Sequence, residues 1–305
     1  MRWLDATPHP GLVIEVTPER VSAARFTRAG SVDGFAVENL SPGVVVPSAI
    51  EPNIINASAV KTALTSLATS LKMKDEDAAL LVPDPVIRVF VQHFDEFPRS
   101  TEEAIPMLRW KLKKSVPFEV DETLLSYMRQ PSRGEGVDVV TSIARLRIIK
   151  EYESLLESIG VRPGVVLSST LAAISLLEDR RPTLLARLSG TSLTTAIVRE
   201  GVLAGYRCTE LPATAAEITP QMLLEEVFPL AAYYQDTWQE GIQAVRVAGL
   251  YKRLPEFVRP LQDEFQCDVG SLLNSAISEG LLHNDVRPLA DRELEGLVGW
   301  MMHKN

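Results

Sequence analysis

A short polar turn between two strands is the part of this sequence whose residue types are best suited to chemistry. Residues Leu184–Arg207 read as strand, turn, strand, turn and strand. The first turn, Ser189–Ser192, reads Ser-Gly-Thr-Ser, and the backbone N–H groups of such a turn can surround a phosphate. Gly201 in the second turn supplies the positive φ that a tight hairpin needs. The pattern predicts the scaffold of a phosphate-binding loop.

The strand before this turn carries a cation and no acidic residue. Arg187 stands near its end, whereas a carboxylate would be needed to hold Mg²⁺ directly or through water. A guanidinium repels the metal ion but can pair with phosphate oxygens itself. We weigh two roles for Arg187, metal-free anion binding together with Thr191 and a structural role at the strand end, and favour the structural one.

No other catalytic or metal-binding pattern occurs in the sequence. It lacks a Walker loop, a Rossmann glycine fingerprint, a nucleophile elbow and a zinc-binding helix. The four histidines are scattered, and Cys208 and Cys267 have no spacing typical of zinc or of a disulfide framework. We therefore predict no catalytic residues, no metal site and a reducing compartment for the two thiols.

Composition favours a cytoplasmic protein that binds no nucleic acid. The 305 residues include 31 Lys and Arg against 40 Asp and Glu, a net charge of −9, whereas nucleic-acid binding needs concentrated positive charge. Lys111, Lys113 and Lys114 form a local basic group, which we interpret as the solvated side of a helix. We expect no signal peptide, and no run approaches the roughly 20 apolar residues that span a bilayer.

The elements that must position the turn occur twice in the chain, as a three-stranded meander followed by a helix. The first copy, Gly11–Leu71, consists of strands at Gly11–Val16, Val21–Thr27 and Gly34–Leu40 and a helix capped by Asn56. The second copy, Leu184–Trp238, consists of the hairpin strands and a helix at Thr219–Trp238. Further strands are predicted after the two copies, at Ala78–Val82 and Ala244–Ala248. A strand near Val165–Leu167 and helices at Thr170–Leu177, Leu254–Phe265 and Asp291–His303 are also expected.

Between the two copies lies a unit of different character. It is predicted to contain a strand at Val86–Phe94, a helix from Ser100 to Pro117, strands at Leu124–Met128 and Val137–Leu146, and a helix at Ile148–Ile159 that ends at Gly160. Aromatic side chains gather in this unit, at Phe90, Phe94, Phe97, Trp110 and Phe118. They either form its core or line a groove for an extended peptide, and the core is the simpler interpretation.

This arrangement resembles the PilM family of type IV pilus assembly proteins, whose fold is actin-like. The segments that carry the resemblance keep their order over nearly the whole chain: Leu108-Arg109-Trp110, Val116-Pro117-Phe118, Leu125-Ser126-Tyr127, Glu153–Pro163, Ile197–Gly201, Ala232-Tyr233-Tyr234 and Leu294–Met301. The resemblance implies an α/β (α+β) protein of the actin-like, ribonuclease H-like type, with two lobes and an inserted α+β subdomain. It implies lobes at 1–82 and 165–305, with part of 165–182 in the first lobe and the second at about 183–305, and an insert at 83–164.

All three segments that contact nucleotide in the family are altered here. The first Asp-x-Gly is replaced by Val13-Ile14-Glu15, the second by Arg187-Leu188-Ser189, and the glycine run by Gly249 alone. Because phosphoryl transfer depends on metal and on electrostatic positioning, the loss of both acids argues against catalysis. We expect no cofactor; if ATP does bind, the contacts would be Arg187, Ser189, Gly190, Thr191, Ser192 and Gly249.

The resemblance further implies a cytoplasmic scaffold that binds other proteins. PilM-like proteins hold the N-terminal cytoplasmic tail of the inner-membrane protein PilN, and a pilus motor ATPase is a further candidate partner. The residues expected to contact the tail are Phe90, Phe94, Arg109, Lys113 and Phe118. The protein would then lie at the inner membrane through its partners. The alternatives are an ATP-binding switch or ATPase of the actin-like superfamily, and the cytoplasmic domain of a type II secretion protein.

Overall fold

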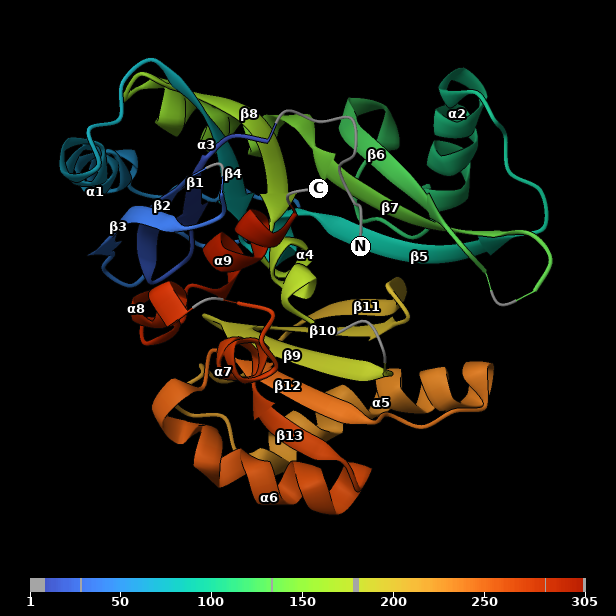
Figure 1. Ribbon diagram of the computed structural model, residues 1–305. Coiled ribbons are helices and arrows are strands. Elements are labelled where there is room, and N and C mark those ends of the chain that lie inside the picture. The colour runs from blue at the N-terminus through green and yellow to red at the C-terminus, as the bar shows by residue number, and fades with distance from the viewer. Residues whose placement is uncertain (1–8, 28, 133, 178–180, 283, 304–305) are drawn as a thin grey trace.

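The described residues form two five-stranded sheets and a smaller three-stranded sheet, with helices packed on them, as a computed structural model shows (Figure 1). The structure describes residues 9–27, 29–132, 134–177, 181–282 and 284–303. Each of the two larger sheets begins with an antiparallel meander and adds two parallel strands beside the first strand of that meander. The duplication expected from the sequence is therefore present as two sheets of the same plan.

The first lobe is built on a sheet in the order β3-β2-β1-β4-β8. Its strands are β1 (Leu12–Val16), β2 (Arg20–Phe26), β3 (Val32–Asn39), β4 (Glu76–Val82) and β8 (Val161–Ser168). Helices α1 (Ala57–Ser70) and α3 (Leu146–Glu157) belong to this lobe, and α3 packs on β8 and α1. Asn56 caps α1 as expected, since its side chain accepts the N–H of Ala59.

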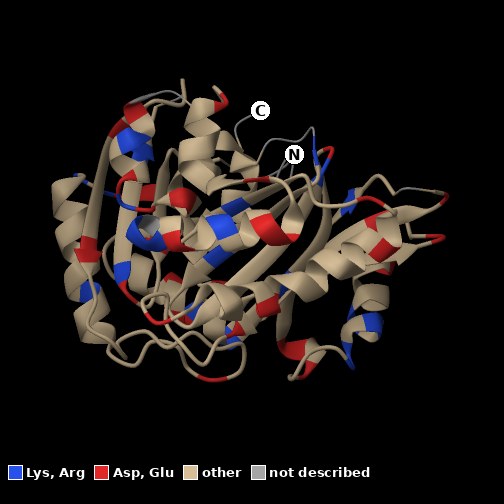
Figure 2. Ribbon diagram, turned by 90° about the horizontal axis from the view of Figure 1, so that it is seen from below, with Lys and Arg blue, Asp and Glu red and all other residues tan. Residues whose placement is uncertain are grey.

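The second lobe repeats this plan in the order β11-β10-β9-β12-β13. Its strands are β9 (Thr183–Ser189), β10 (Ser192–Arg199), β11 (Val202–Glu210), β12 (Ala244–Ala248) and β13 (Asp268–Ser271). Its helices are α5 (Pro220–Trp238), α6 (Leu254–Phe265) and α7 (Leu272–Ser278). Basic and acidic residues are interspersed over the face of the molecule seen from below (Figure 2).

The insert is a small sheet, in the order β5-β7-β6, with α2 beside it (Figure 1). Its elements are β5 (Arg88–Phe94), α2 (Thr101–Leu112), β6 (Thr123–Gln130) and β7 (Val137–Arg145). It also touches the second lobe, because Gln130 donates its side-chain amide to Leu203 O at 2.7 Å and accepts Leu203 N–H at 3.1 Å. Both hydrogen bonds are buried, and together they fix the end of β6 to β11 in the way that a pair of backbone hydrogen bonds joins neighbouring strands.

The two chain segments that pass between the lobes lie directly against each other. They contain α4 (Ser169–Ala173), which leads toward the second lobe, and α8 (Arg287–Ala290) and α9 (Glu295–Met302), which return. A Cβ on Gly299 would lie 2.2 Å from Ala172 O, so α4 and α9 approach backbone to backbone. Trp300 of α9 is buried in the core of the first lobe and donates its indole N–H to Pro10 O at 3.1 Å.

Several boundaries differ from the sequence-based expectation. The helix expected to reach Pro117 ends at Leu112, because the exposed residues that follow bury no apolar surface to support another turn. Strand β8 begins at Val161, inside the region 83–164 assigned to the insert. Helix α9 packs on β1 and α4 of the first lobe, although 183–305 was assigned to the second. Strand β13 and helix α7 were not predicted.

Short 3-10 turns account for two further differences. Asp84–Val86 forms such a turn, so β5 begins at Arg88 instead of Val86, and Ile174–Leu176 continues α4 in place of the single helix expected at Thr170–Leu177. The remaining 3-10 turns lie at Val120–Glu122, Tyr251–Arg253 and Asn284–Val286. The last of these and α8 precede α9, which begins at Glu295, four residues later than the helix expected from Asp291.

Candidate functional site

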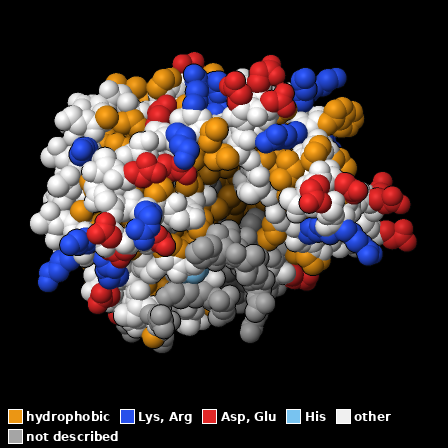
Figure 3. All heavy atoms as spheres, turned by 90° about the horizontal axis from the view of Figure 1, so that it is seen from above, with side chains coloured by type: hydrophobic (Ala, Val, Ile, Leu, Met, Phe, Trp, Pro, Cys, Tyr) orange, Lys and Arg blue, Asp and Glu red, His pale blue; other side chains and the backbone are white. Residues whose placement is uncertain are grey.

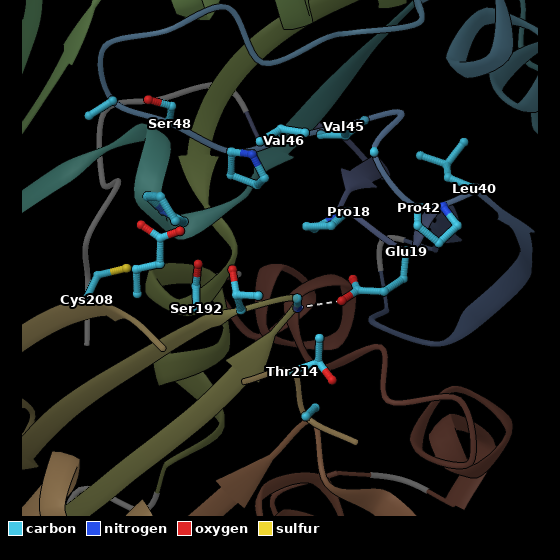
Figure 4. Close-up of a pocket in the computed structure, with 18 of the residues that line it drawn as sticks. Pro18, Glu19, Leu40, Pro42, Val45, Val46, Ser48, Ser192, Cys208 and Thr214 are labelled. Atoms are coloured by element: carbon cyan, nitrogen blue, oxygen red, sulfur yellow. Dashed lines mark hydrogen bonds between the residues drawn. The ribbon is translucent and has the colours of Figure 1, made fainter. Parts of the chain in front are cut away.

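The two turns that would hold phosphates face each other across the cleft between the lobes (Figure 4). One joins β1 to β2 and contains Pro18 and Glu19; the other joins β9 to β10 and contains Gly190. The carboxylate of Glu19 accepts the backbone N–H of Gly190, the kind of donor that a phosphate would use. A Cβ on Gly190 would lie only 3.0 Å from Pro18 Cγ, so the turns are also in van der Waals contact.

Arg187 of β9 points into the protein and links the two lobes. Its guanidinium donates to Glu15 Oε1 of β1 at 3.0 Å and lies 3.4 Å from Asp84 Oδ2, and the residue is only 4% exposed. Burial alone would lower the pKa of Arg187, but the negative charges of Glu15 and then Asp84 outweigh it and raise the pKa. The arginine therefore stays charged and holds two carboxylates of the same protein.

Asp84 is the centre of this buried network, which we call the cleft cluster: Glu15, Asp84, Thr170, Arg187, Thr194 and Tyr206. The Asp84 carboxylate accepts Thr170 N–H at 2.9 Å, the Thr170 hydroxyl at 2.5 Å and the Thr194 hydroxyl at 2.9 Å. Tyr206 Oη lies 3.4 Å from Asp84 Oδ1. Elements of both lobes and the first residues of the insert are thus joined at one carboxylate.

Sequence reasoning singled out Arg187 and Glu15 but not Asp84. A signal was available, because Asp84 stands between two prolines directly after the wholly buried end of β4. An acid at the end of a buried strand, in a segment that cannot continue as a strand, often marks a functional or structural polar site.

Helix α9 brings a further carboxylate to the edge of the cleft cluster. Glu295 is buried, and this burial raises the pKa of Glu295 to about 7 against the opposing effect of Arg187. Next to it, Gly296 lies so close to Glu15 that a Cβ would come within 2.6 Å of Glu15 Oε1. The return helix therefore covers the cluster and leaves no room beside Glu15 for a larger side chain.

The other candidate nucleotide contacts lie at the end of β9 and in the turn that follows it. Gly249, which has φ +83°, packs its backbone on β9, because a Cβ there would lie 2.2 Å from Leu188 O. This contact requires glycine whether or not a nucleotide is near. Ser192 is buried at the start of β10, and Thr191 is exposed. Together with Ser189, these residues surround the second turn, whose central N–H is already used by Glu19.

The side chains expected to bind a partner tail lie beneath or beside α2 instead of lining one groove. Phe90 and Phe118 pack around the buried Leu112 and Val116. Phe94 packs edge-on against Phe97, with the two ring centroids 5.0 Å apart. Lys111 Nζ sits 3.8 Å from the centre of the Phe94 ring.

Two basic side chains complete the set of expected partner contacts. Arg109 donates to Thr123 O at 3.1 Å, and Lys113 is exposed where α2 ends. Trp110 between them is 79% exposed. Arg109 is therefore bound to the start of β6, and Lys113 and Trp110 face the solvent.

A groove that sequence reasoning did not find runs between the first lobe and the insert. We call it the edge groove; it has a volume of about 360 Å³ and is lined mainly by residues of β6, β7 and β8, among them Leu124, Leu125, Val165 and Leu167. Figure 3 shows a hollow with hydrophobic side chains on this face of the molecule. The groove was missed because its walls come from two different sheets, whose order along the chain does not show that they are neighbours.

Neither a metal-binding cluster nor a membrane-spanning helix occurs in the part of the chain that the structure describes. No group of three or more His, Cys, Asp or Glu side chains is arranged there to hold a metal ion. Over the same residues, no helix is both long enough and apolar enough to cross a membrane.

Comparison with known proteins places the fold among actin-like proteins. No family model matches the sequence, and no curated protein does. A solved chain of a PilM–PilN type IV pilus biogenesis complex shares 14% identity and a TM-score of 0.72, over 97% of this chain and 98% of that one. The cytoplasmic domain of EpsL, an inner-membrane component of the type II secretion system of Vibrio cholerae, shares 10% identity and a TM-score of 0.50, over 78% and 81%. The expected two-lobed actin-like fold is thereby confirmed.

Proposed function

We propose that this protein is a non-catalytic scaffold of type IV pilus assembly. In this proposal it binds, in the edge groove, the cytoplasmic tail of a PilN-like inner-membrane protein and lies at the inner membrane through that partner. The observation that carries the proposal is the edge groove, in a chain whose fold follows a PilM–PilN complex chain over 97% of its length.

The walls of the edge groove are suited to an extended peptide. Strands β6 and β8 are each the last strand of their sheet, so each has a row of backbone groups that no strand of that sheet uses. An extended segment can pair with such an edge, and alternate side chains then enter apolar pockets. Leu124, at the start of β6, is 46% exposed in the groove and offers one such contact.

The cleft cluster supports a function without nucleotide chemistry. Catalysis of phosphoryl transfer needs a metal ion, positioned phosphates and a water or acceptor between the lobes. Here Arg187 and two carboxylates fill the floor of the cleft, and Glu19 uses a donor of the second phosphate turn. We therefore propose that tail binding does not depend on ATP.

A binding assay with synthetic tails tests both parts of this proposal. The purified protein is titrated calorimetrically with peptides that correspond to the cytoplasmic N-termini of inner-membrane pilus and type II secretion proteins, with and without ATP and Mg²⁺. Leu124→Asp should weaken binding of a pilus tail at least tenfold, because it places a charge in an apolar groove. Phe228→Asp, a matched change at a 51% exposed position of α5 outside the groove, should leave the affinity unchanged.

Three results would contradict the proposal. If no pilus tail binds, a PilN-like partner is ruled out. If Leu124→Asp and Phe228→Asp bind the tail with equal affinity, the edge groove is not the binding site. Binding that requires ATP and Mg²⁺ would favour the alternative of a nucleotide switch. Tighter binding of a secretion tail than of any pilus tail would favour the alternative of a type II secretion protein.

A further inference from the structure

The cleft above the phosphate turns contains a large cavity with walls of unusual composition for a nucleotide site. It has a volume of about 750 Å³, a size that suits a small-molecule ligand (Figure 4). One wall is the loop after β3, with Leu40, Pro42, Val45, Val46 and Pro47. Five prolines line the cavity in all, namely Pro18, Pro42, Pro47, Pro85 and Pro117.

The loop wall is held in place before any ligand arrives. Asn53 is fully buried, donates its amide to Ser48 O at 2.9 Å and Glu51 O at 2.7 Å, and accepts Ser48 N–H at 2.9 Å. The hydroxyl of Tyr152 donates to the same side-chain oxygen at 3.0 Å. The Asn53 side chain therefore satisfies three backbone groups of the loop, and Val45, Val46, Pro42 and Pro47 line the cavity. A loop that is already held in this way loses little entropy when a ligand binds.

The charges around the cavity oppose a nucleoside triphosphate. Among the described lining residues, Glu19 and Glu210 carry negative charge and Arg88 carries positive charge, which leaves one net negative charge. The donor that a phosphate would use, Gly190 N–H, is already bonded to Glu19. A ligand with several negative charges would meet repulsion from both carboxylates and find one arginine to compensate.

We infer that this cavity binds an uncharged, mainly apolar ligand between the lobes. Val46 supports this assignment, since its side chain is 49% exposed on the cavity wall and gains burial when an apolar molecule enters. The inference is independent of the edge groove, which lies between the first lobe and the insert, on other residues.

Fluorescence titration with Nile red, an uncharged apolar dye, tests the inference on the intact protein. Val46→Asp should weaken dye binding on the order of tenfold, because it puts a charge on the apolar wall. Ile55→Asp is the matched control, since Ile55 is 61% exposed, near the same loop and not among the lining residues. Both positions are open to solvent, so neither variant should unfold the protein, and circular dichroism checks this.

The outcomes separate this inference from the proposed function. The inference is supported if dye binding falls with Val46→Asp but persists with Ile55→Asp, and if a pilus tail does not displace the dye. Equal binding by the two variants overturns it, as does loss of the dye with Leu124→Asp, which would place it in the edge groove. Displacement of the dye by micromolar ATP with Mg²⁺ would show that the cavity still selects nucleotides and would also overturn it.

Discussion

Replacement of Arg187 by methionine is the most direct test of the cleft cluster. Methionine keeps much of the length and the apolar stem of the side chain but removes the charge. The variant leaves Glu15 and Asp84, which are 0% and 4% exposed, without their shared cation. We expect the free energy of unfolding to fall by about 3–5 kcal/mol, the usual cost of breaking a buried ion pair from one side.

Most of this loss of stability should come from Glu15. Asp84 keeps the Thr170 and Thr194 donors after the substitution, whereas Glu15 Oε1 loses Arg187 and Glu15 Oε2 already has no hydrogen-bond partner in the structure. Glu15→Gln in the Arg187→Met background removes the stranded charge. We expect it to restore about 0.5–3 kcal/mol, the range found for coupled neighbours.

Urea unfolding at pH 7.5, followed by tryptophan fluorescence and circular dichroism, measures these free energies. Arg162→Met is the matched control, because Arg162 pairs with Asp77 at 2.7 Å but both side chains are more than half exposed. That change should cost less than about 1 kcal/mol. An Arg187→Met protein as stable as the Arg162→Met protein, or a double variant less stable than Arg187→Met alone, would refute the reasoning.

Two further predictions concern α9 and the insert. Burial raises the pKa of Glu295 to about 7, so its contribution to stability is complete below pH 4.5 and is lost as pH rises to 7; burial lowers the pKa of His303 to about 4, so its contribution is complete above pH 6.5 and is lost as pH falls to 4. The two pH dependences oppose each other in the unsubstituted protein, so each variant should reveal the one that remains. In Glu295→Gln the free energy of unfolding should fall by about 3 kcal/mol on acidification, and in His303→Gln it should fall by a similar amount as pH rises. Urea titrations at pH 4.5, 5.5 and 7 would detect these changes, and parallel pH profiles for the two variants would contradict the prediction. Gln130→Ala leaves Leu203 N–H and C=O unpaired, which should cost about 1–3 kcal/mol and speed amide exchange at Leu203. Unchanged exchange there would show that water replaces the side chain.

Local patterns explain why much of the fold could be predicted. The meanders were found because each strand is an apolar run bounded by turn residues, and α1 and α5 because Asn56 and Thr219 cap them. Strand β13 was missed because its four residues, Asp-Val-Gly-Ser, contain one apolar side chain and are stabilised as a strand only by pairing with β12.

The candidate site was less accessible to sequence reasoning because its parts are distant in the chain. Arg187 is separated by 172 residues from Glu15 and by 103 from Asp84, so no local spacing relates them. The sequence showed that a positive charge had replaced an expected acid, but only the fold shows which carboxylates it meets. The edge groove is still harder to predict from sequence, because it can be recognised only once the order of strands in two sheets is known.

The position of the cleft cluster connects the cleft between the lobes to the edge groove. Asp84 lies where the chain leaves β4 for the insert, and Thr170 lies just after β8, where it has returned to the first lobe. Their hydrogen bonds, with Arg187 from the second lobe, fix both crossings of the insert at one point. Since β8 is also a wall of the edge groove, the cluster holds that wall without a ligand. At the floor of the cleft the lobes are linked by the chain's own charges, without a nucleotide, and the proposed peptide site can therefore be permanently formed.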